Sequence, residues 1–162
     1  MKTAICPGSF DPVTIGHLDI IGRARKIFDH VIVAVMVNPK KNTLFTAEER
    51  VTLIQKCIGN MDDVEVVCFD GLLADYARIR SADAIVKGLR ALSDFEYEFQ
   101  QALTNKKLNP QLETMFLITR SENMFLSSSI VKQIAGFGGD ISNFVPACIL
   151  EDIKERIYAS KG

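Results

Sequence analysis

Short apolar runs rich in β-branched residues recur along the chain and alternate with longer segments whose apolar residues follow helical spacing. The runs cover residues 3–6, 31–37, 64–68, 84–87 and 115–118. Parallel strands that are buried on both faces have continuous apolar sequences, and helices connect one strand to the next. The pattern therefore predicts an α/β fold: a doubly wound, five-stranded parallel sheet covered by helices on both faces.

Capping residues mark several helix boundaries. Thr46 followed by Glu49, and Ser93 followed by Glu96, match the capping box, in which a hydroxyl and a carboxylate satisfy backbone N–H groups at a helix start. Gly59 is expected to end the helix that Thr46 opens. We expect the remaining helices at about 16–28, 72–80, 127–135 and 147–159, with the run GFGG at 136–139 as a helix stop and turn.

Composition narrows the class of protein. A chain of 162 residues predicts a single domain over residues 1–162. The formal net charge is -1, so no overall field indicates nucleic acid or a membrane as the partner. No apolar run approaches the ~18 residues that a transmembrane helix needs, and no charged leader precedes the first strand, so we expect a cytoplasmic protein. The four cysteines are widely spaced, and we expect reduced, buried thiols for the three that lie in apolar runs.

The segment after the first strand carries the first candidate site. Ligands of doubly wound sheets bind beyond the carboxyl ends of the strands, and here that segment is PGSFDPVTIGH, residues 7–17. Gly8 allows a sharp turn beside a ligand, while Gly16 and His17 begin a helix whose free N–H groups favour an anion. We therefore expect His17 to face the same space as Ser9, in a nucleotide phosphate site. The alternative is an ordinary connecting loop in which His17 only caps a helix.

Cations and hydroxyls follow the other strands. Lys40 and Lys41 come after the second strand, and Lys87 and Arg90 come after the fourth. Ammonium and guanidinium groups at one edge of a sheet suit phosphate, although a lysine pair on a loop is more often only solvated. The serines at 127–129 open a helix after the fifth strand, where hydroxyls cap the backbone, bind phosphate, or do both.

The helix that follows the fourth strand has two stripes. Polar residues recur at spacings of four, three and four, at Asp94, Glu98, Gln101 and Asn105, and the apolar stripe consists of Phe95, Phe99 and Leu103. Spacing alone leaves open whether the polar stripe faces a ligand or only water.

The candidate chemistry consists of hydrogen-bond donors and cations, because the sequence offers no nucleophile paired with a base and no cluster of metal ligands. That set suits transfer of a phosphoryl or nucleotidyl group, in which positioning and charge stabilisation carry the reaction. Mg²⁺ would be carried on the nucleotide phosphates.

Three motifs resemble those of a known enzyme family. PGSFDPVTIGH ends in the T-x-G-H pattern of the nucleotidyltransferase superfamily, and KGLRALSDFEYEFQ at 87–100 and FLSSSIVK at 125–132 are similar to the bacterial phosphopantetheine adenylyltransferases. The resemblance extends from residue 2 to about residue 150. It implies a Rossmann-like nucleotidyltransferase fold with strand order 3-2-1-4-5, and a homo-oligomer that is typically a hexamer. It also implies transfer of AMP from ATP to 4'-phosphopantetheine, giving dephospho-coenzyme A and pyrophosphate for coenzyme A biosynthesis, with coenzyme A as an inhibitor.

The resemblance also implies residue roles. The 4'-phosphate of phosphopantetheine would attack the α-phosphorus of ATP directly and in line, without a covalent enzyme intermediate. The transition state would be stabilised by the catalytic residues His17, Lys41, Arg90 and Ser9. ATP would be bound by Ser9, Phe10, His17, Gly88, Leu89, Arg90, Glu98, Asn123, Met124, Phe125, Leu126, Ser127, Ser128 and Ser129. Phosphopantetheine would be bound by Ser9, Lys41, Leu73, Lys87 and Asn105.

Position 87 departs from the family pattern, which usually has arginine there. Lysine keeps the charge but loses the bidentate fork, so we expect a weaker hold on phosphopantetheine with the chemistry intact.

Two other functions are compatible with these residues. One is a transferase acting on another phosphate acceptor, such as glycerol 3-phosphate or nicotinamide mononucleotide, and the GLRALSDFEYE segment argues against it. The other is a module that binds a nucleotide or coenzyme A without catalysing a reaction. The presence of Ser9, His17, Lys41 and Arg90 together argues against it and favours catalysis.

Overall fold

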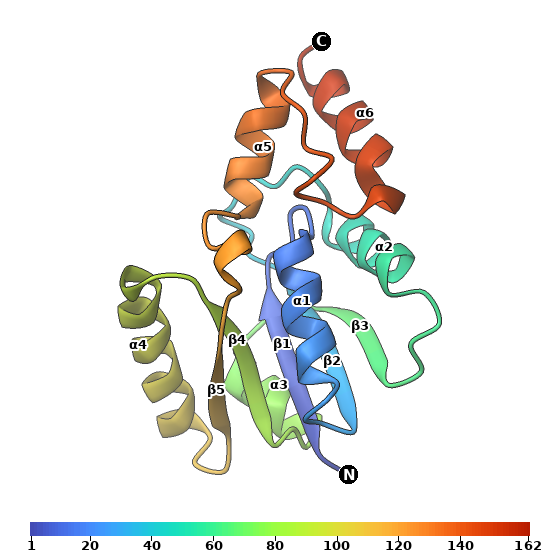
Figure 1. Ribbon diagram of the computed structural model, residues 1–162. Helices are drawn as coiled ribbons and strands as arrows, with labels where there is room; N and C mark the ends of the chain where they lie inside the picture. Colours follow the sequence, from blue (N-terminus) through green and yellow to red (C-terminus); the bar gives the residue numbers. More distant parts are fainter.

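The predicted strands form one parallel sheet with the order β3-β2-β1-β4-β5 (Figure 1). The computed structural model describes the backbone of all 162 residues and every side chain except that of Ser93. Each pair of neighbouring strands is parallel. The strands are β1 (Thr3–Gly8), β2 (His30–Met36), β3 (Val64–Phe69), β4 (Ala84–Leu89) and β5 (Glu113–Ile118). The predicted fold class and strand order are therefore confirmed.

Helices connect the strands and cover both faces of the sheet. The α-helices are α1 (Ile15–Ala24), α2 (Ala47–Ile58), α3 (Leu73–Ile79), α4 (Leu92–Leu108), α5 (Ser128–Gly136) and α6 (Leu150–Ser160). The 3₁₀ helices η1 (Ser121–Asn123) and η2 (Ala147–Ile149) precede α5 and α6. The first helix is shorter than the predicted 16–28. After Ala24 the chain tightens into turns, in which Lys26 N–H donates to Arg23 O and Ile27 N–H donates to Ala24 O.

One of the two predicted capping boxes is present. At the start of α2, Thr46 Oγ1 accepts from Glu49 N–H at 3.2 Å, and Glu49 Oε2 accepts from Thr46 N–H at 2.8 Å. Gly59 ends this helix with φ of +57°, a conformation that favours glycine. The capping box predicted at Ser93 and Glu96 is wrong, because α4 begins at Leu92 with Ala91 as its N-cap residue, which places position 93 inside the helix. The GFGG run ends α5 in a turn with Gly138 at φ of +77°.

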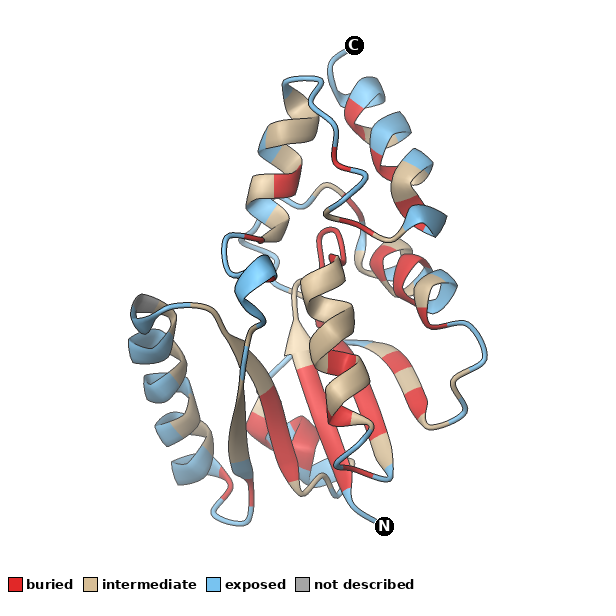
Figure 2. Cartoon of the chain, viewed as in Figure 1, coloured by how far each residue is buried: buried red, intermediate tan, exposed pale blue. Residues whose placement is uncertain are grey.

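Alternating side chains on the central strands build a core on each face of the sheet. On β1, Ala4 and Cys6 belong to the core under α1, α2, α5 and α6, whereas Ile5 belongs to the core under α3. This period of two is the geometry of a strand whose faces are both covered. Figure 2 shows buried residues filling the central strands, while much of α4 stays exposed.

The expectation of buried thiols is correct for Cys6 and wrong for two others. Cys68 and Cys148 are exposed, Cys57 is partly buried, and the thiols of these described residues are free. Cys68 lies on β3, which is an edge strand, so its apolar run is not enclosed on all sides. Across the described helices, we find no segment with both the length and the apolar character needed to cross a membrane.

Candidate active site

A cavity of about 300 Å³ opens at the carboxyl ends of β1 and β4. These strands pair at the centre of the sheet, with β2 and β3 on one side and β5 on the other. Ligands of doubly wound sheets bind at such a switch point. The lining comes from the ends of β1 and β4, the loop after β1, α1, the start of α4, and the segment between β5 and α5. Segments that are distant in sequence therefore meet around one space.

The loop after β1 is held by packing and by a buried guanidinium. The residue with positive φ in this loop is Phe10, at +50°, and not Gly8 as expected. A Cβ at Gly8 would lie 3.1 Å from the Phe10 ring, so the glycine makes room for that ring. Arg50 is 4% exposed, and its NH1 donates to Ser9 O at 2.7 Å. The backbone at Ser9 is thus fixed beside the cavity.

His17 both caps α1 and lines the cavity. Thr14 is the N-cap residue: its Oγ1 accepts from His17 N–H at 3.3 Å, and its own N–H donates to His17 Nδ1 at 3.0 Å. A ring nitrogen that accepts a hydrogen bond carries no proton, so the proton of the neutral imidazole is on Nε2. Burial, together with the charges of Lys87 and Arg90, lowers the pKa of His17 to about 4. At neutral pH this side chain is an uncharged N–H donor.

Lys87 and Arg90 are paired with carboxylates of α4. Lys87 Nζ lies 3.3 Å from Glu98 Oε1, and Arg90 Nε lies 3.1 Å from Asp94 Oδ2. Arg90 NH1 also donates to Leu126 O at 3.0 Å, which ties β4 to the segment before α5. All four charged side chains line the cavity and are partly buried. Two cations balance two anions, so a phosphate that binds to either cation competes with a carboxylate for it.

An ordinary surface helix buries its apolar stripe and exposes its polar stripe, but the two stripes of α4 are arranged differently. Asp94 and Glu98, from the polar stripe, line the cavity, so the alternative that this stripe faces only water is wrong at these two positions. The apolar stripe is instead largely exposed, at 38% for Phe95, 45% for Phe99 and 56% for Leu103. This helix therefore contributes its carboxylates to the cavity and leaves apolar side chains on the surface.

The serine turn, residues 127–129, is tied to the loop after β1. Ser127 is the N-cap of α5 and accepts from Ile130 N–H at 3.1 Å. Ser128 Oγ donates to Pro12 O at 2.7 Å. Both serines line the cavity, so the start of α5, where backbone N–H groups are free, faces the same space as His17.

Gly88 lets α1 lie close against β4. A Cβ at this position would come within 2.9 Å of Ile20 Cγ1, which is closer than real Cβ contacts allow. Ile20 follows His17 by three residues on α1, about one helical turn. The absence of a side chain at position 88 therefore brings the imidazole close to the cations of β4.

Most of the predicted site residues line this cavity. They are Ser9, Phe10, His17, Lys87, Gly88, Arg90, Glu98, Asn123, Leu126, Ser127 and Ser128. The cavity lining does not include Lys41, Leu73, Leu89, Asn105, Met124, Phe125 or Ser129. Lys41 lies in an exposed turn after β2, where its N–H donates to Asn38 O. Leu73 begins α3, and Asn105 lies in the second half of α4.

The lining also contains residues that were not predicted as site residues: Cys6, Pro7, Gly8, Thr14, Gly16, Ile20, Ile21, Val86, Asp94 and Thr119. A sequence signal existed for Asp94, because it stands four residues after Arg90 and four before Glu98, at the spacing of helical neighbours. Thr119 directly follows the last residue of β5, so its place at a strand end was also a usable signal.

Known proteins resemble this chain in sequence and in structure. Residues 5–134 match the family model described as cytidylyltransferase-like. The chain is 58% identical over 156 residues to phosphopantetheine adenylyltransferase from Alkaliphilus oremlandii, covering 96% of this chain and 99% of that protein. It is 52% identical over 162 residues to phosphopantetheine adenylyltransferase from Clostridium perfringens, covering 100% and 99%. Its fold is similar to that of Plasmodium falciparum nicotinic acid mononucleotide adenylyltransferase complexed with NaAD, with a TM-score of 0.66, 13% identity, and coverage of 99% and 97%.

Proposed function

We infer that this chain, which belongs to the phosphopantetheine adenylyltransferase family within the cytidylyltransferase-like proteins, transfers AMP from ATP to 4'-phosphopantetheine. The products are dephospho-coenzyme A and pyrophosphate, in coenzyme A biosynthesis. One observation carries this proposal: a single cavity at the switch point of the sheet gathers His17, two cations and the start of α5. Such a set of donors suits two phosphorylated molecules that react with each other.

The proposed reaction is a direct attack by a 4'-phosphate oxygen of phosphopantetheine on the α-phosphorus of ATP. That oxygen is ionised near pH 7, so no general base is needed. His17 donates its Nε2–H to the charge that develops on the α-phosphate, and Lys41, Arg90 and the hydroxyl of Ser9 add to this stabilisation. Holding two substrates in line contributes roughly 7 to 11 kcal/mol, and one well-placed donor about 3 to 4 kcal/mol.

The two substrates are proposed to occupy different parts of the site. The nucleotide and its outer phosphates lie along Gly88, Leu89, Arg90, Glu98 and the segment 123–129, with contacts to Ser9 and Phe10. The phosphate of phosphopantetheine lies near Ser9, Lys41 and Lys87. Its pantetheine arm extends beyond the cavity lining toward Leu73 and Asn105.

Mg²⁺ is proposed to arrive with ATP, held by the phosphate oxygens. The cavity carboxylates Asp94 and Glu98 are engaged by Arg90 and Lys87. Among the described residues, no group of three or more His, Cys, Asp or Glu side chains is arranged to hold a metal ion. That donor set fits a cation bound mainly by substrate phosphates. When bound, the ion would neutralise charge on the departing pyrophosphate.

We further propose a cytoplasmic homohexamer that coenzyme A inhibits. Self-association is supported by the apolar side chains that α4 exposes, because exposed apolar patches commonly mark protein interfaces. These side chains belong to Leu92, Phe95, Tyr97, Phe99 and Leu103. Coenzyme A contains the dephospho-coenzyme A product, which supports its binding in the same cavity. Light scattering after size exclusion measures the assembly, and a mass of one chain would refute it.

An assay of the purified protein with ATP, Mg²⁺ and phosphopantetheine tests the function, with dephospho-coenzyme A identified by mass. Parallel reactions contain glycerol 3-phosphate or nicotinamide mononucleotide as the acceptor. We expect ATP to release pyrophosphate when phosphopantetheine is the acceptor and not when either of the other two acceptors replaces it. Release with another acceptor instead would reassign the substrate, and ligand-induced stabilisation without any product would indicate a binding module.

A further inference from the structure

Asp11 is a buried carboxylate in the middle of the loop after β1. The residue is 3% exposed, and it stands between Phe10, which lines the cavity, and Pro12, whose carbonyl accepts from Ser128 Oγ. A buried carboxylate is costly unless each oxygen has partners. Its partners therefore show what the charge holds in place.

The carboxylate of Asp11 binds two other segments. Oδ2 accepts from Leu44 N–H at 2.8 Å, and Oδ1 accepts from Phe45 N–H at 2.9 Å. Lys132 Nζ lies 3.1 Å from Oδ2. Leu44 and Phe45 close the loop that follows β2, and Lys132 lies on α5. One side chain thus joins the loop after β1, the loop after β2 and α5.

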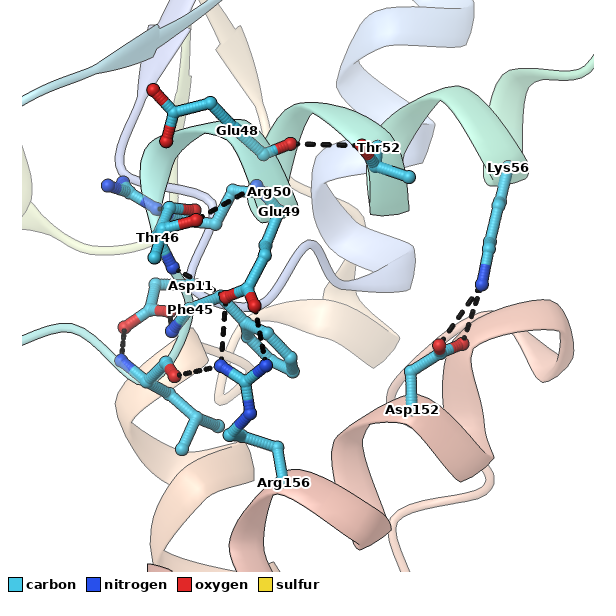
Figure 3. A network of polar contacts seen from close by, with 11 residues as sticks. Asp11, Phe45, Thr46, Glu48, Glu49, Arg50, Thr52, Lys56, Asp152 and Arg156 are labelled. Atoms are coloured by element: carbon cyan, nitrogen blue, oxygen red, sulfur yellow. Dashed lines mark hydrogen bonds and ion pairs between the residues drawn. The ribbon is translucent and has the colours of Figure 1, made fainter.

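The segment held by Asp11 is also held from its other side, by α6. Arg156 NH1 donates to Leu44 O at 2.9 Å, and its guanidinium lies 4.7 Å from the centre of the Phe45 ring. The same guanidinium binds both carboxylate oxygens of Glu49, at 2.6 and 2.8 Å. Figure 3 shows Asp11 and Arg156 on either side of this segment. The end of the loop after β2 is therefore fixed between two charged groups.

We propose that Asp11 is a positioning residue for the transferase reaction, an inference that rests on the proposed function. Lys41 stands three residues before Leu44, a reach of at most about 11 Å along the chain. Lys132 stands four residues after Ser128, on the same face of α5. By binding both segments, Asp11 sets the place of the Lys41 ammonium and of the serine turn relative to Ser9. The two groups then hold the two proposed substrates, phosphopantetheine at Lys41 and the nucleotide at the serine turn, in the right place relative to each other.

The chemistry at this position requires a carboxylate. Each of the three partners is a hydrogen-bond donor, and an ionised carboxylate only accepts. In Asp11→Asn one oxygen becomes an NH₂ group that faces either a backbone N–H or the Lys132 ammonium. One donor is then left without a partner, and Lys132 loses its counter-charge.

A double-mutant cycle tests whether Asp11 acts through Lys41. Asp11→Asn should lower kcat/KM for phosphopantetheine by about 30-fold, the size expected for hydrogen bonds to a charged group. In a Lys41→Ala background the same change should lower it by less than about threefold, because the placement of Lys41 no longer matters. Effects of equal size in both backgrounds would overturn the proposal, and so would an Asp11→Asn variant with wild-type kinetics.

Asp83→Asn is the matched control. The Asp83 carboxylate also accepts from a backbone N–H, that of Thr3 at 2.8 Å, and binds a lysine, with Lys2 Nζ at 2.9 Å, but it lies at the opposite end of the sheet. This variant should lower the melting temperature while kcat/KM stays within about twofold of wild type. If Asp83→Asn lowers kcat/KM as much as Asp11→Asn does, the effect is general destabilisation and the positioning role is refuted.

Two further measurements test the role of Asp11 even if the Asp11→Asn variant loses activity through misfolding. Lys132→Met breaks only the link to α5, and should raise the KM for ATP about threefold; an unchanged value refutes that link. Hydrogen exchange at the Leu44 and Phe45 amides should be at least about tenfold faster in Asp11→Asn. Unchanged exchange rates would refute the claim that Asp11 holds this segment in place. A wild-type protein that makes no dephospho-coenzyme A would overturn the proposed function itself, whereas an active wild type with an additive cycle would overturn only the role of Asp11.

Discussion

The two ends of the sheet carry similar charged residues in different arrangements. At the amino ends of the strands, Lys2 pairs with Asp83 at 2.9 Å and Arg25 pairs with Asp63 at 2.6 Å, on the surface. At the carboxyl ends, Lys87 and Arg90 also pair with carboxylates, but around a cavity. Each end also has one of the two histidines, since His30 begins β2 and His17 lies in the first turn of α1.

Convergence on a cavity, and not the number of charges, distinguishes the candidate site from a stabilised surface. At the amino ends, the pKa of Asp83 is lowered, mainly by the Thr3 N–H, and that of Asp63 is lowered by Arg25. These carboxylates are already satisfied by protein partners. At the carboxyl ends, the Nε2–H of His17 and the start of α5 face the cavity together with the cations. Predictions about paired positions at the two ends test this contrast.

The largest expected difference is between the two histidines. His17→Ala should lower kcat by about 100-fold, because the side-chain donor to the developing charge is lost, while the KM for ATP changes little. The backbone N–H of residue 17 still donates to Thr14 Oγ1, so part of the cap of α1 is retained. His30→Ala is the control and should keep the wild-type kcat. Steady-state rates of pyrophosphate release measure both, and a His17→Ala enzyme near the wild-type rate would remove His17 from the chemistry.

The second prediction concerns protonation of His17. With His30→Ala in place, the remaining imidazole NMR signals belong to His17, and they should titrate with a midpoint near pH 4. The ordinary pKa of histidine is about 6.5, so the unfolded chain takes up this proton first and folding stability falls as the pH drops from about 6.5 to 4. The free energy of unfolding in urea should fall more from pH 7 to pH 5 for the wild type than for His17→Ala, which lacks the titrating imidazole. A midpoint above pH 6 would contradict the buried, neutral state.

The third prediction compares glycines at the two ends. Gly88→Ala should destabilise the fold by about 1 to 3 kcal/mol and also lower kcat, because the new Cβ meets Ile20 and moves α1. Gly59 lies at the amino end of the sheet with φ of +57° and ψ of −132°, a backbone conformation nearly restricted to glycine, and Gly59→Ala should cost about 1 to 3 kcal/mol through backbone strain alone. Denaturant unfolding and kcat, measured on the same preparations, separate the loss of stability from the loss of catalytic rate. Equal kinetic losses in both variants would mean that α1 placement is not the cause.

The smallest effect is expected at Lys87. Lys87→Met should raise the KM for phosphopantetheine about tenfold, because a charge-assisted contact to phosphate is lost. Lys87→Arg should lower that KM by a few-fold through bidentate binding, with kcat unchanged. Lys2→Met, at the opposite end of the sheet, is the matched control and should leave both constants unchanged. An unchanged or higher KM in Lys87→Arg would argue against a phosphate contact at this position.

Sequence patterns predicted the fold well because burial on both faces of a parallel sheet leaves a strong local signal. The apolar runs located each strand to within a few residues, and the rule for ligand position directed attention to His17 and Lys87. The orientation of α4 was not predictable, because spacing defines its stripes without saying which one faces the cavity. The role of Asp11 was not predictable either, because the backbone N–H groups that it binds are 33 and 34 residues away in the sequence and only folding brings them together.

The ion pairs of Lys87 with Glu98 and of Arg90 with Asp94 have a consequence for selectivity among anions. The carboxylates compete with any incoming anion for the same cations. A monovalent ion such as chloride gains little by exchanging with one carboxylate, whereas the two proposed substrates exchange with both, the nucleotide phosphates at Arg90 and the phosphate of phosphopantetheine at Lys87. We therefore expect moderate concentrations of sodium chloride to weaken the binding of either substrate only slightly, because these cations are partly buried.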